Sequence, residues 1–72
     1  MANENICIRF GRKLRRLRKS RKWNQTYLAE HSGIGRPHIS NLENGKEEPK
    51  LRTLRDLADS FDMSLSQLLS RL

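Results

Sequence analysis

Residues 25–44, QTYLAEHSGIGRPHISNLEN, contain the features of two short helices that cross at a steep angle. Gly33 follows the first helical pattern, and glycine accepts the left-handed backbone with which one helix ends before another begins. Pro37 falls in the first turn of the second pattern, where its missing N–H costs no hydrogen bond. Ala29 is a small residue suited to a close helix crossing, and four apolar residues supply a shared core: Leu28, Ile34, Ile39 and Leu42. We expect the second helix to cover residues 36–44.

Helical patterns also flank this pair. Ile6, Phe10, Leu14 and Leu17 recur at intervals of four, four and three, which predicts a helix over about residues 6–21. Asn24 is suited to cap the helix that begins at residue 25, with Trp23 folding over Leu28. Beyond the pair, Asn44-Gly45-Lys46 predicts a helix end and Glu47-Glu48-Pro49 a loop.

Two more helices are expected towards the C-terminus. Apolar residues at 51, 54, 57, 58 and 61 predict a fourth amphipathic helix. Ser64 and Gln67 match a capping box, which predicts a fifth helix over about residues 65–71. No segment alternates polar and apolar residues as a half-buried strand does. The sequence therefore predicts one all-α domain of five helices over residues 1–72, with residues 25–44 at its centre.

Composition excludes several classes of protein. Cys7 is the only cysteine, so no disulfide can form within the chain, and Cys7, His31 and His38 lack the paired spacing of a zinc site. No apolar run approaches the roughly 18 residues of a membrane span, and the first residues, Met1–Asn5, are polar. We expect a cytoplasmic protein with no metal or cofactor. A core this small suggests oligomerisation as a source of stability.

Positive charge is concentrated near the N-terminus. The chain has 15 Lys+Arg and 8 Asp+Glu, a net charge of +7, and nine of the cations fall within residues 9–22 with no acid among them. Such a run repels itself unless a polyanion or counterions neutralise it, and nucleic acid is the commonest polyanionic partner. A solvated helix face and an anionic membrane surface are the alternatives that charge alone leaves open.

Two stretches resemble the Cro/cI-type (XRE) helix-turn-helix regulators, a family that includes phage repressors and the controller proteins of restriction-modification systems. They are FGRKLRRLRKSRKWNQTYLAEHSG, residues 10–33, and ISNLENGKEEPKLRTLRDLADSFDMSLSQLL, residues 39–69. The resemblance implies a compact, lambda-repressor-like, five-helix fold that binds DNA. Ser32, Gly35 and Lys50 depart from the usual pattern, which has an apolar residue, a Ser/Thr cap and a serine at these positions.

The second helix of such a pair can lie in the major groove while the first spans the DNA backbone. Since Ile39 and Leu42 take the inward side, the outward side carries five candidate base-reading residues: Arg36, Pro37, His38, Ser40 and Asn41. Arg36 is the leading candidate, because a guanidinium can grip guanine O6 and N7 with two hydrogen bonds, and Asn41 could do the same for adenine. The alternatives are a solvated Arg36, and a phosphate contact or simple exposure for His38.

Contacts to phosphate are expected around this helix. The resemblance implies that Asn24 and Gln25 face the DNA backbone at a helix N-terminus, although both could be caps that touch nothing. It also implies an ion pair between Arg18 and Glu43 that turns Arg18 towards phosphate, unless Glu43 only balances the basic run. The resemblance also places the loop at the end of the helix over residues 36–44 close to the backbone of the second DNA strand. The candidate phosphate-binding residues there are Asn44, Lys46 and Lys50, and the alternative is that they only form an exposed loop.

The C-terminal segment has more apolar surface than a small domain buries. Six residues are candidates for a twofold dimer contact or, alternatively, for the core: Phe61, Met63, Leu65, Leu68, Leu69 and Leu72. We expect a homodimeric, non-enzymatic regulator that binds a palindromic operator in double-stranded DNA, without a membrane or a small-molecule effector. The alternatives are an antitoxin-like adaptor that binds protein through the same fold, and a sequence-independent nucleic-acid binder.

Overall fold

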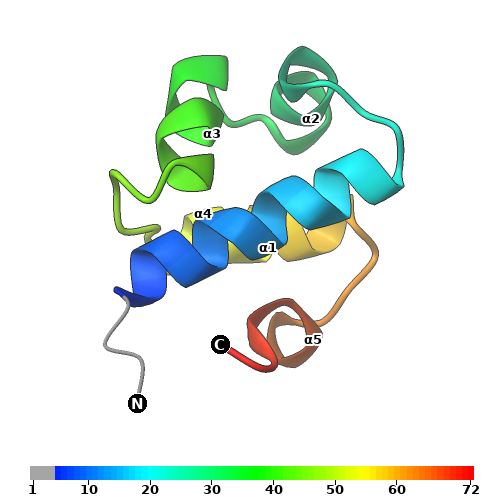
Figure 1. Ribbon diagram of the computed structural model, residues 1–72. Coiled ribbons are helices and arrows are strands. Elements are labelled where there is room, and N and C mark those ends of the chain that lie inside the picture. Colours follow the sequence, from blue (N-terminus) through cyan, green and yellow to red (C-terminus); the bar gives the residue numbers. More distant parts are fainter. Residues whose placement is uncertain (1–4) are drawn as a thin grey trace.

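A computed structural model describes residues 5–72, and within that range it contains five α-helices and no strand (Figure 1). The helices are α1 (Ile6–Ser20), α2 (Gln25–Ser32), α3 (Arg36–Glu43), α4 (Leu51–Ser60) and α5 (Leu65–Leu69). The expected all-α, five-helix fold is confirmed. Residues 1–4, which belong to the predicted domain and to the polar stretch Met1–Asn5, lie outside the described range.

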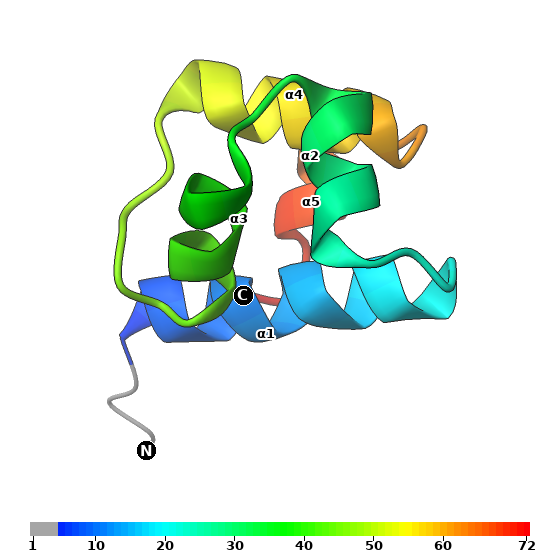
Figure 2. The same cartoon turned by 90° about the horizontal axis from the view of Figure 1, so that it is seen from above.

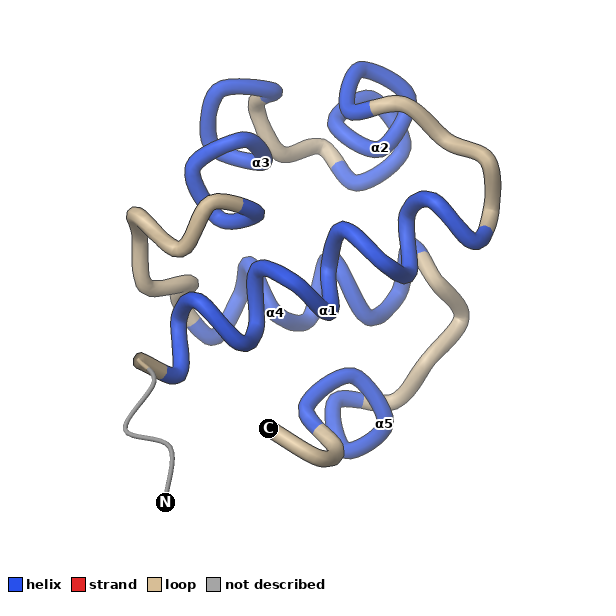
Figure 3. The backbone as a smooth tube through the Cα atoms, in the orientation of Figure 1, coloured by secondary structure: helices blue, strands red, loops and turns tan. Residues whose placement is uncertain are grey.

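The long helix α1 runs through the middle of the molecule. Helices α2 and α3 lie on one side of it, α5 lies on the other, and α4 closes the core behind it (Figures 1 and 2). The tube in Figure 3 shows that short loops join these elements. The turn between α2 and α3 carries Gly33 at φ +77°, the left-handed conformation expected there.

Residues from all five helices meet in one apolar core, together with Ile34 from the turn and Phe61 at the end of α4. Phe10 and Leu14 come from α1, and the others are Leu28, Ile34, Ile39, Leu42, Leu57, Ala58, Phe61 and Leu68. Trp23 covers one edge, where its ring stacks on that of Phe61 at 5.4 Å between centroids. The two helices of the central pair therefore share a core, as their pattern predicted, and residues of α1 contribute to it.

The ends of the helices follow the predicted capping chemistry in part. Asn24 Oδ1 accepts from the Tyr27 amide at 2.7 Å, and Ser64 and Gln67 complete the capping box of α5. Gly35 and Lys50, two of the departures from the family pattern, cap α3 and α4 without a side-chain hydrogen bond. Helix α5 ends at Leu69 rather than at Arg71, because Ser70 is extended and Arg71 has φ +62°.

Helices α1 and α3 cross in close contact at Gly11. A Cβ built on this buried glycine would lie 2.5 Å from the backbone oxygens of both Leu42 and Glu43. Only a glycine therefore lets α1 approach α3 this closely. The crossing fixes the end of α3 against α1, which brings Glu43 next to the basic residues of that helix.

No helix that the structure describes combines the length and the apolar character needed to cross a membrane. Within residues 5–72, no three His, Cys, Asp or Glu side chains gather closely enough to hold a metal ion.

Candidate nucleic-acid interface

One side of α3 is buried and the other is accessible. Ile39 and Leu42 have no exposed surface, and Glu43 is only 5% exposed. The five candidate base-reading residues lie elsewhere on the helix: Arg36 and Pro37 are exposed, and His38, Ser40 and Asn41 are half-buried. Because α3 stands on the outer side of the molecule next to α2 (Figure 1), this face is open to a ligand.

A chain of hydrogen bonds links the first residues of α2 and α3 to the end of α3. Arg36 Nη1 donates to Gln25 Oε1 at 3.1 Å, and Gln25 Nε2 donates to Glu43 Oε1 at 3.1 Å. Both the oxygen and the nitrogen of the Gln25 side-chain amide are thus hydrogen-bonded. Contact with a phosphate therefore depends on the free backbone amides at the start of α2. Arg36 is held by one contact and keeps further N–H groups for a ligand.

Glu43 is the centre of this network. Its carboxylate accepts from Arg18 Nε at 2.6 Å, from Arg18 Nη2 at 3.0 Å and from Arg15 Nε at 3.3 Å. Burial raises the pKa of Glu43, but the hydrogen bonds and charge supplied by Arg18, Gln25 and Arg15 outweigh it, and the net pKa is lowered. The hydrogen bond to Glu43 likewise raises the pKa of Arg18. The pair is therefore ionised and internally compensated.

The ion pair predicted between Arg18 and Glu43 is present, but its geometry disfavours the phosphate contact that was predicted for Arg18. Its side chain is only 9% exposed, both Nε and Nη2 donate to Glu43, and Nη1 donates to the Trp23 carbonyl at 2.8 Å. A guanidinium with these bonds has little left to offer a phosphate, so we assign Arg18 to holding α1, α3 and the start of α2 together. Arg15 is the more accessible member of the cluster, with its side chain 45% exposed.

Glu47 contacts two of the candidate base-reading side chains. Its Oε1 accepts from Asn41 Nδ2 at 2.6 Å, and its Oε2 lies 2.7 Å from His38 Nδ1. Asn41 therefore has one of its two amide N–H groups engaged by Glu47, and its other N–H and its carbonyl oxygen remain for a base. We call these two contacts of Glu47 the Glu47 clamp. The sequence indicated only that Glu47 lies in a loop, and the spacing of the residues did not predict the two contacts.

The candidate phosphate contacts surround α3. Asn24 uses Oδ1 as a cap, and within residues 5–72 its Nδ2 has no hydrogen-bond partner. Asn44 Oδ1 accepts from Arg15 Nη2 at 3.1 Å, so this side chain is partly engaged. Lys46 and Lys50 are exposed in the loop after α3, and neither ammonium group pairs with a described residue.

The six candidate dimer residues divide into two groups. Phe61 and Leu68 have no exposed surface, so they complete the chain's own core and are not available to a partner. The other four keep some surface: Met63, Leu65, Leu69 and Leu72. The most exposed large apolar residues are instead Leu51 at 71% and Ile6 at 62%, which the dimer prediction did not include.

Some of these exposed residues lie around one shallow depression. A groove of about 270 Å³ is lined by the start of α1, the loop before α4 and the end of the chain, with Ile6, Leu54, Leu69 and Leu72 among its apolar residues. The candidate partner-binding surface is therefore broader than α5 alone.

Two short helices joined by a tight glycine turn, with the second presenting a polar and basic face, define a helix-turn-helix DNA-binding domain. The family model described as helix-turn-helix matches residues 14–68, most of the chain. The protein belongs to this helix-turn-helix family, of the XRE type, which confirms the resemblance found in the sequence.

Relatives of the chain are regulators by name. It is 43% identical over 58 residues to the competence pilus inhibition repressor of Acinetobacter baylyi, covering 81% of this chain and 53% of that protein. It is 36% identical over 67 residues to the control protein C.MunI of a Mycoplasma species, covering 92% of this chain and 90% of that one. The chain spans about half the length of several curated relatives, including 51% of the regulator AnsR of Bacillus subtilis.

A solved structure has the same fold. The restriction-modification controller protein C.AhdI of Aeromonas hydrophila superposes with a TM-score of 0.83 at 31% identity, covering 86% of this chain and 94% of that one.

Proposed function

We propose that this protein is a sequence-specific DNA-binding regulator of transcription that places α3 in the major groove of a palindromic operator. The observation that carries the proposal is the accessible face of α3, whose opposite side is fixed to the core by Ile39 and Leu42. A helix held in this way is a rigid reader, and the groove admits one α-helix.

Arg36 is the proposed principal base reader. Its contact with Gln25 restricts the guanidinium before DNA arrives, so less side-chain entropy is lost on binding. A correct two-bond contact to guanine discriminates by roughly 1–3 kcal/mol. Asn41 and His38 read bases in a manner set by Glu47, Pro37 offers only apolar contact, and Ser40 can accept or donate one hydrogen bond.

Contacts to phosphate position the helix without reading sequence. We assign them to the first amides of α2 at Asn24 and Gln25, and to Asn44, Lys46 and Lys50 after α3. The segments carrying these groups lie before and after α3 in the chain, which is the arrangement expected if the protein contacts both strands of the duplex.

A homodimer is part of the proposal. Half-sites on one face of DNA lie roughly 34 Å apart, and a twofold dimer of small domains is the usual way to reach both. Exposed Ile6 and Leu69, which line the groove at the end of the chain, and exposed Leu51 at the start of α4 favour self-association, because a monomer gains nothing from apolar side chains in water. C.MunI and C.AhdI, which are named as controller proteins, are of similar length to this chain.

The alternatives are weaker on specific grounds. An adaptor that bound protein through α3 would need apolar surface there, whereas the exposed large apolar residues lie on α1, α2, α4 and α5. A sequence-independent binder has no use for a guanidinium held at the start of α3. We also propose that the whole chain is one domain, that it acts by binding rather than by catalysis, and that it works in the cytoplasm on the nucleoid.

Selection of bound fragments from a pool of random duplexes tests the proposal. We expect the enriched sequences to share an inverted repeat, and a repeat of the selection with Arg36→Ala to lose the preference at one base pair of each half-site. Lys46→Ala serves as the matched control, since loss of a phosphate contact weakens all sequences alike. Enrichment of no common sequence would contradict base reading by α3.

A further inference from the structure

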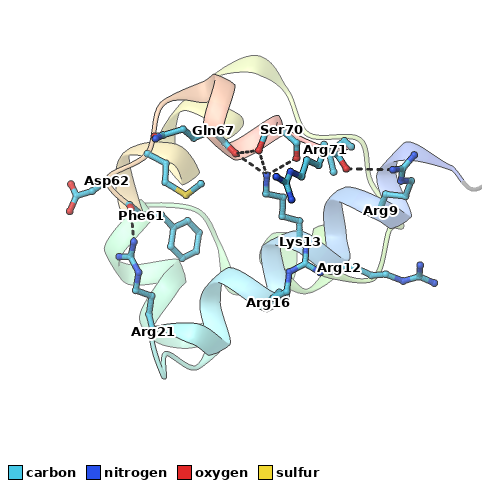
Figure 4. Close-up of a pocket in the computed structure, with 12 residues that line it drawn as sticks. Arg9, Arg12, Lys13, Arg16, Arg21, Phe61, Asp62, Gln67, Ser70 and Arg71 are labelled. Atoms are coloured by element: carbon cyan, nitrogen blue, oxygen red, sulfur yellow. Dashed lines mark hydrogen bonds between the residues drawn. The ribbon is translucent and has the colours of Figure 1, made fainter.

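A second basic surface lies on the side of α1 that is turned away from α3. It is a cavity of about 760 Å³ between α1 and the C-terminal segment, shown in close-up in Figure 4. Six of the lining residues are cationic, and Asp62 is the one acidic side chain among the lining residues. The cations are Arg9, Arg12, Lys13, Arg16, Arg21 and Arg71.

The structure divides the basic run of the sequence between two faces. Arg15 and Arg18 bind Glu43 at the end of α3, whereas Arg9, Lys13 and Arg16 line the cavity with helical spacings of four and three. Because α5 lies on the other side of α1 from α2 and α3 (Figure 1), DNA bound by α3 does not neutralise this second group. These cations therefore need a different explanation.

Lys13 shows how positive this surface is. Its ammonium donates to Gln67 O and Ser70 O at 2.8 Å and to Ser70 Oγ at 3.1 Å, which closes the end of α5 (Figure 4). Burial lowers the pKa of Lys13, and the nearby charges of Arg16 and Arg71 lower it further. Lys13 is thus engaged within the fold, and the guanidinium groups of Arg16 and Arg71 lie close enough to act on its charge.

The composition of the cavity narrows the choice of ligand. Small-molecule sites are lined mostly by apolar and aromatic side chains, unlike this one. A second copy would bring like charges together. A DNA duplex presents its phosphates on a convex backbone, whereas a polypeptide can place flexible carboxylate side chains inside a concave surface. The concave shape of the cavity therefore favours an acidic polypeptide over a duplex. Met63 and Leu72, both half-buried, add apolar surface beside the cations, as an amphipathic polypeptide requires.

We propose that this basic cavity binds an aspartate- or glutamate-rich segment of a partner protein while α3 occupies DNA. The guanidinium groups of Arg9 and Arg16 face the incoming carboxylates, and apolar side chains of the partner pack on Met63 and Leu72. This goes beyond the proposed DNA contact, because it gives the DNA-bound protein a separate surface for another protein. It also leaves Leu65 and Leu69, which do not line the cavity, available for self-association.

Fluorescence anisotropy with a labelled oligoglutamate peptide tests the proposal, using the full chain both free and saturated with its selected duplex. We expect binding in both states at 150 mM salt. Arg9→Ala/Arg16→Ala should weaken peptide binding by about ten-fold and leave the affinity for DNA within about two-fold. Alanine is the best helix former, so these exposed positions on α1 should tolerate it, and circular dichroism checks the fold.

Lys19→Ala/Arg52→Ala is the matched control, because it removes the same charge at exposed helical positions outside the cavity. Screening limits its effect to less than about three-fold, since the Debye length is about 8 Å at this salt concentration. Equal losses in the two double variants, no binding to the free chain, or displacement of the peptide by duplex would overturn the proposal. So would tighter binding of oligothymidylate than of oligoglutamate at the same residues, which would make the cavity a nucleic-acid site.

Discussion

Replacing Glu43 with glutamine should destabilise the protein strongly, although the shape of the side chain hardly changes. The Glu43 side chain has no exposed surface and receives two hydrogen bonds from Arg18, whose side chain is only 9% exposed. Glutamine removes the negative charge and leaves the Arg18 guanidinium buried without compensation. Breaking a buried ion pair in this way costs about 3–5 kcal/mol. A domain of this length has roughly 4–11 kcal/mol in total, from about 0.05–0.15 kcal/mol per residue.

Urea unfolding followed by circular dichroism measures the loss. Arg15→Ala is the control, because Arg15 contacts the same carboxylate from a side chain that is 45% exposed, and it should cost less than about 1 kcal/mol. Arg18→Met/Glu43→Leu should be clearly more stable than Glu43→Gln, since no charge is then left unpaired. A loss below about 1 kcal/mol for Glu43→Gln, or a double variant no better than it, would refute this account of the pair.

The same carboxylate predicts a dependence on pH. The lowered pKa of Glu43 means that the folded state favours its ionised form, so its contribution is present above the unfolded-state pKa of about 4.3 and is lost as the pH falls through the folded-state value. The difference in stability between the natural protein and Glu43→Gln should therefore shrink below about pH 4. A difference that stays constant through acid pH would contradict the assignment.

Further substitutions probe the other contacts. Gly11→Ala should cost about 1–3 kcal/mol of thermal stability despite the helix propensity of alanine, because the new Cβ would meet backbone oxygens of α3 at 2.5 Å; an unchanged melting temperature would show that α1 and α3 separate freely. Asn24→Ala should cost about 1 kcal/mol through the lost cap of α2, measured by urea unfolding, and a neutral result would contradict the capping role. Glu47→Ala should free Asn41 and change the base preferred at its position in a repeated selection, whereas an identical preference would exclude the clamp as a determinant of specificity. Leu51→Glu should weaken self-association in sedimentation experiments, and an unchanged dissociation constant of the dimer would show that Leu51 lies outside the dimer interface.

The helices could be predicted because their signals are local. The spacing of Phe10 and Leu14, the cap at Asn24 and the capping box at Ser64 each involve residues within one turn or two of one another, and the structure contains all three. The end of α5 was predicted two residues too late. Its last turn is replaced by an extended Ser70, whose carbonyl oxygen accepts a hydrogen bond from Lys13 on a helix distant in the sequence.

The parts of the site that were missed depend on contacts between distant segments. No local rule indicates that Gly11 marks the crossing with α3, or that Glu47 reaches back to His38 and Asn41. The family resemblance implied that the pair with Glu43 turns Arg18 towards the DNA backbone, but the three hydrogen bonds of its guanidinium make Arg18 part of the interior. The basic run looked like one surface in the sequence because the pattern does not show that α3 and α5 pack on different sides of α1.

The affinity ratio between the selected duplex and a scrambled duplex of the same length tests most directly whether α3 reads sequence. Measured at physiological salt, the natural protein should prefer the selected duplex by about 10³-fold or more, and Arg36→Ala should reduce that ratio while both affinities keep the same dependence on salt. Equal affinities for the two duplexes, falling equally steeply with salt, would show that the protein only coats nucleic acid and would contradict the central claim.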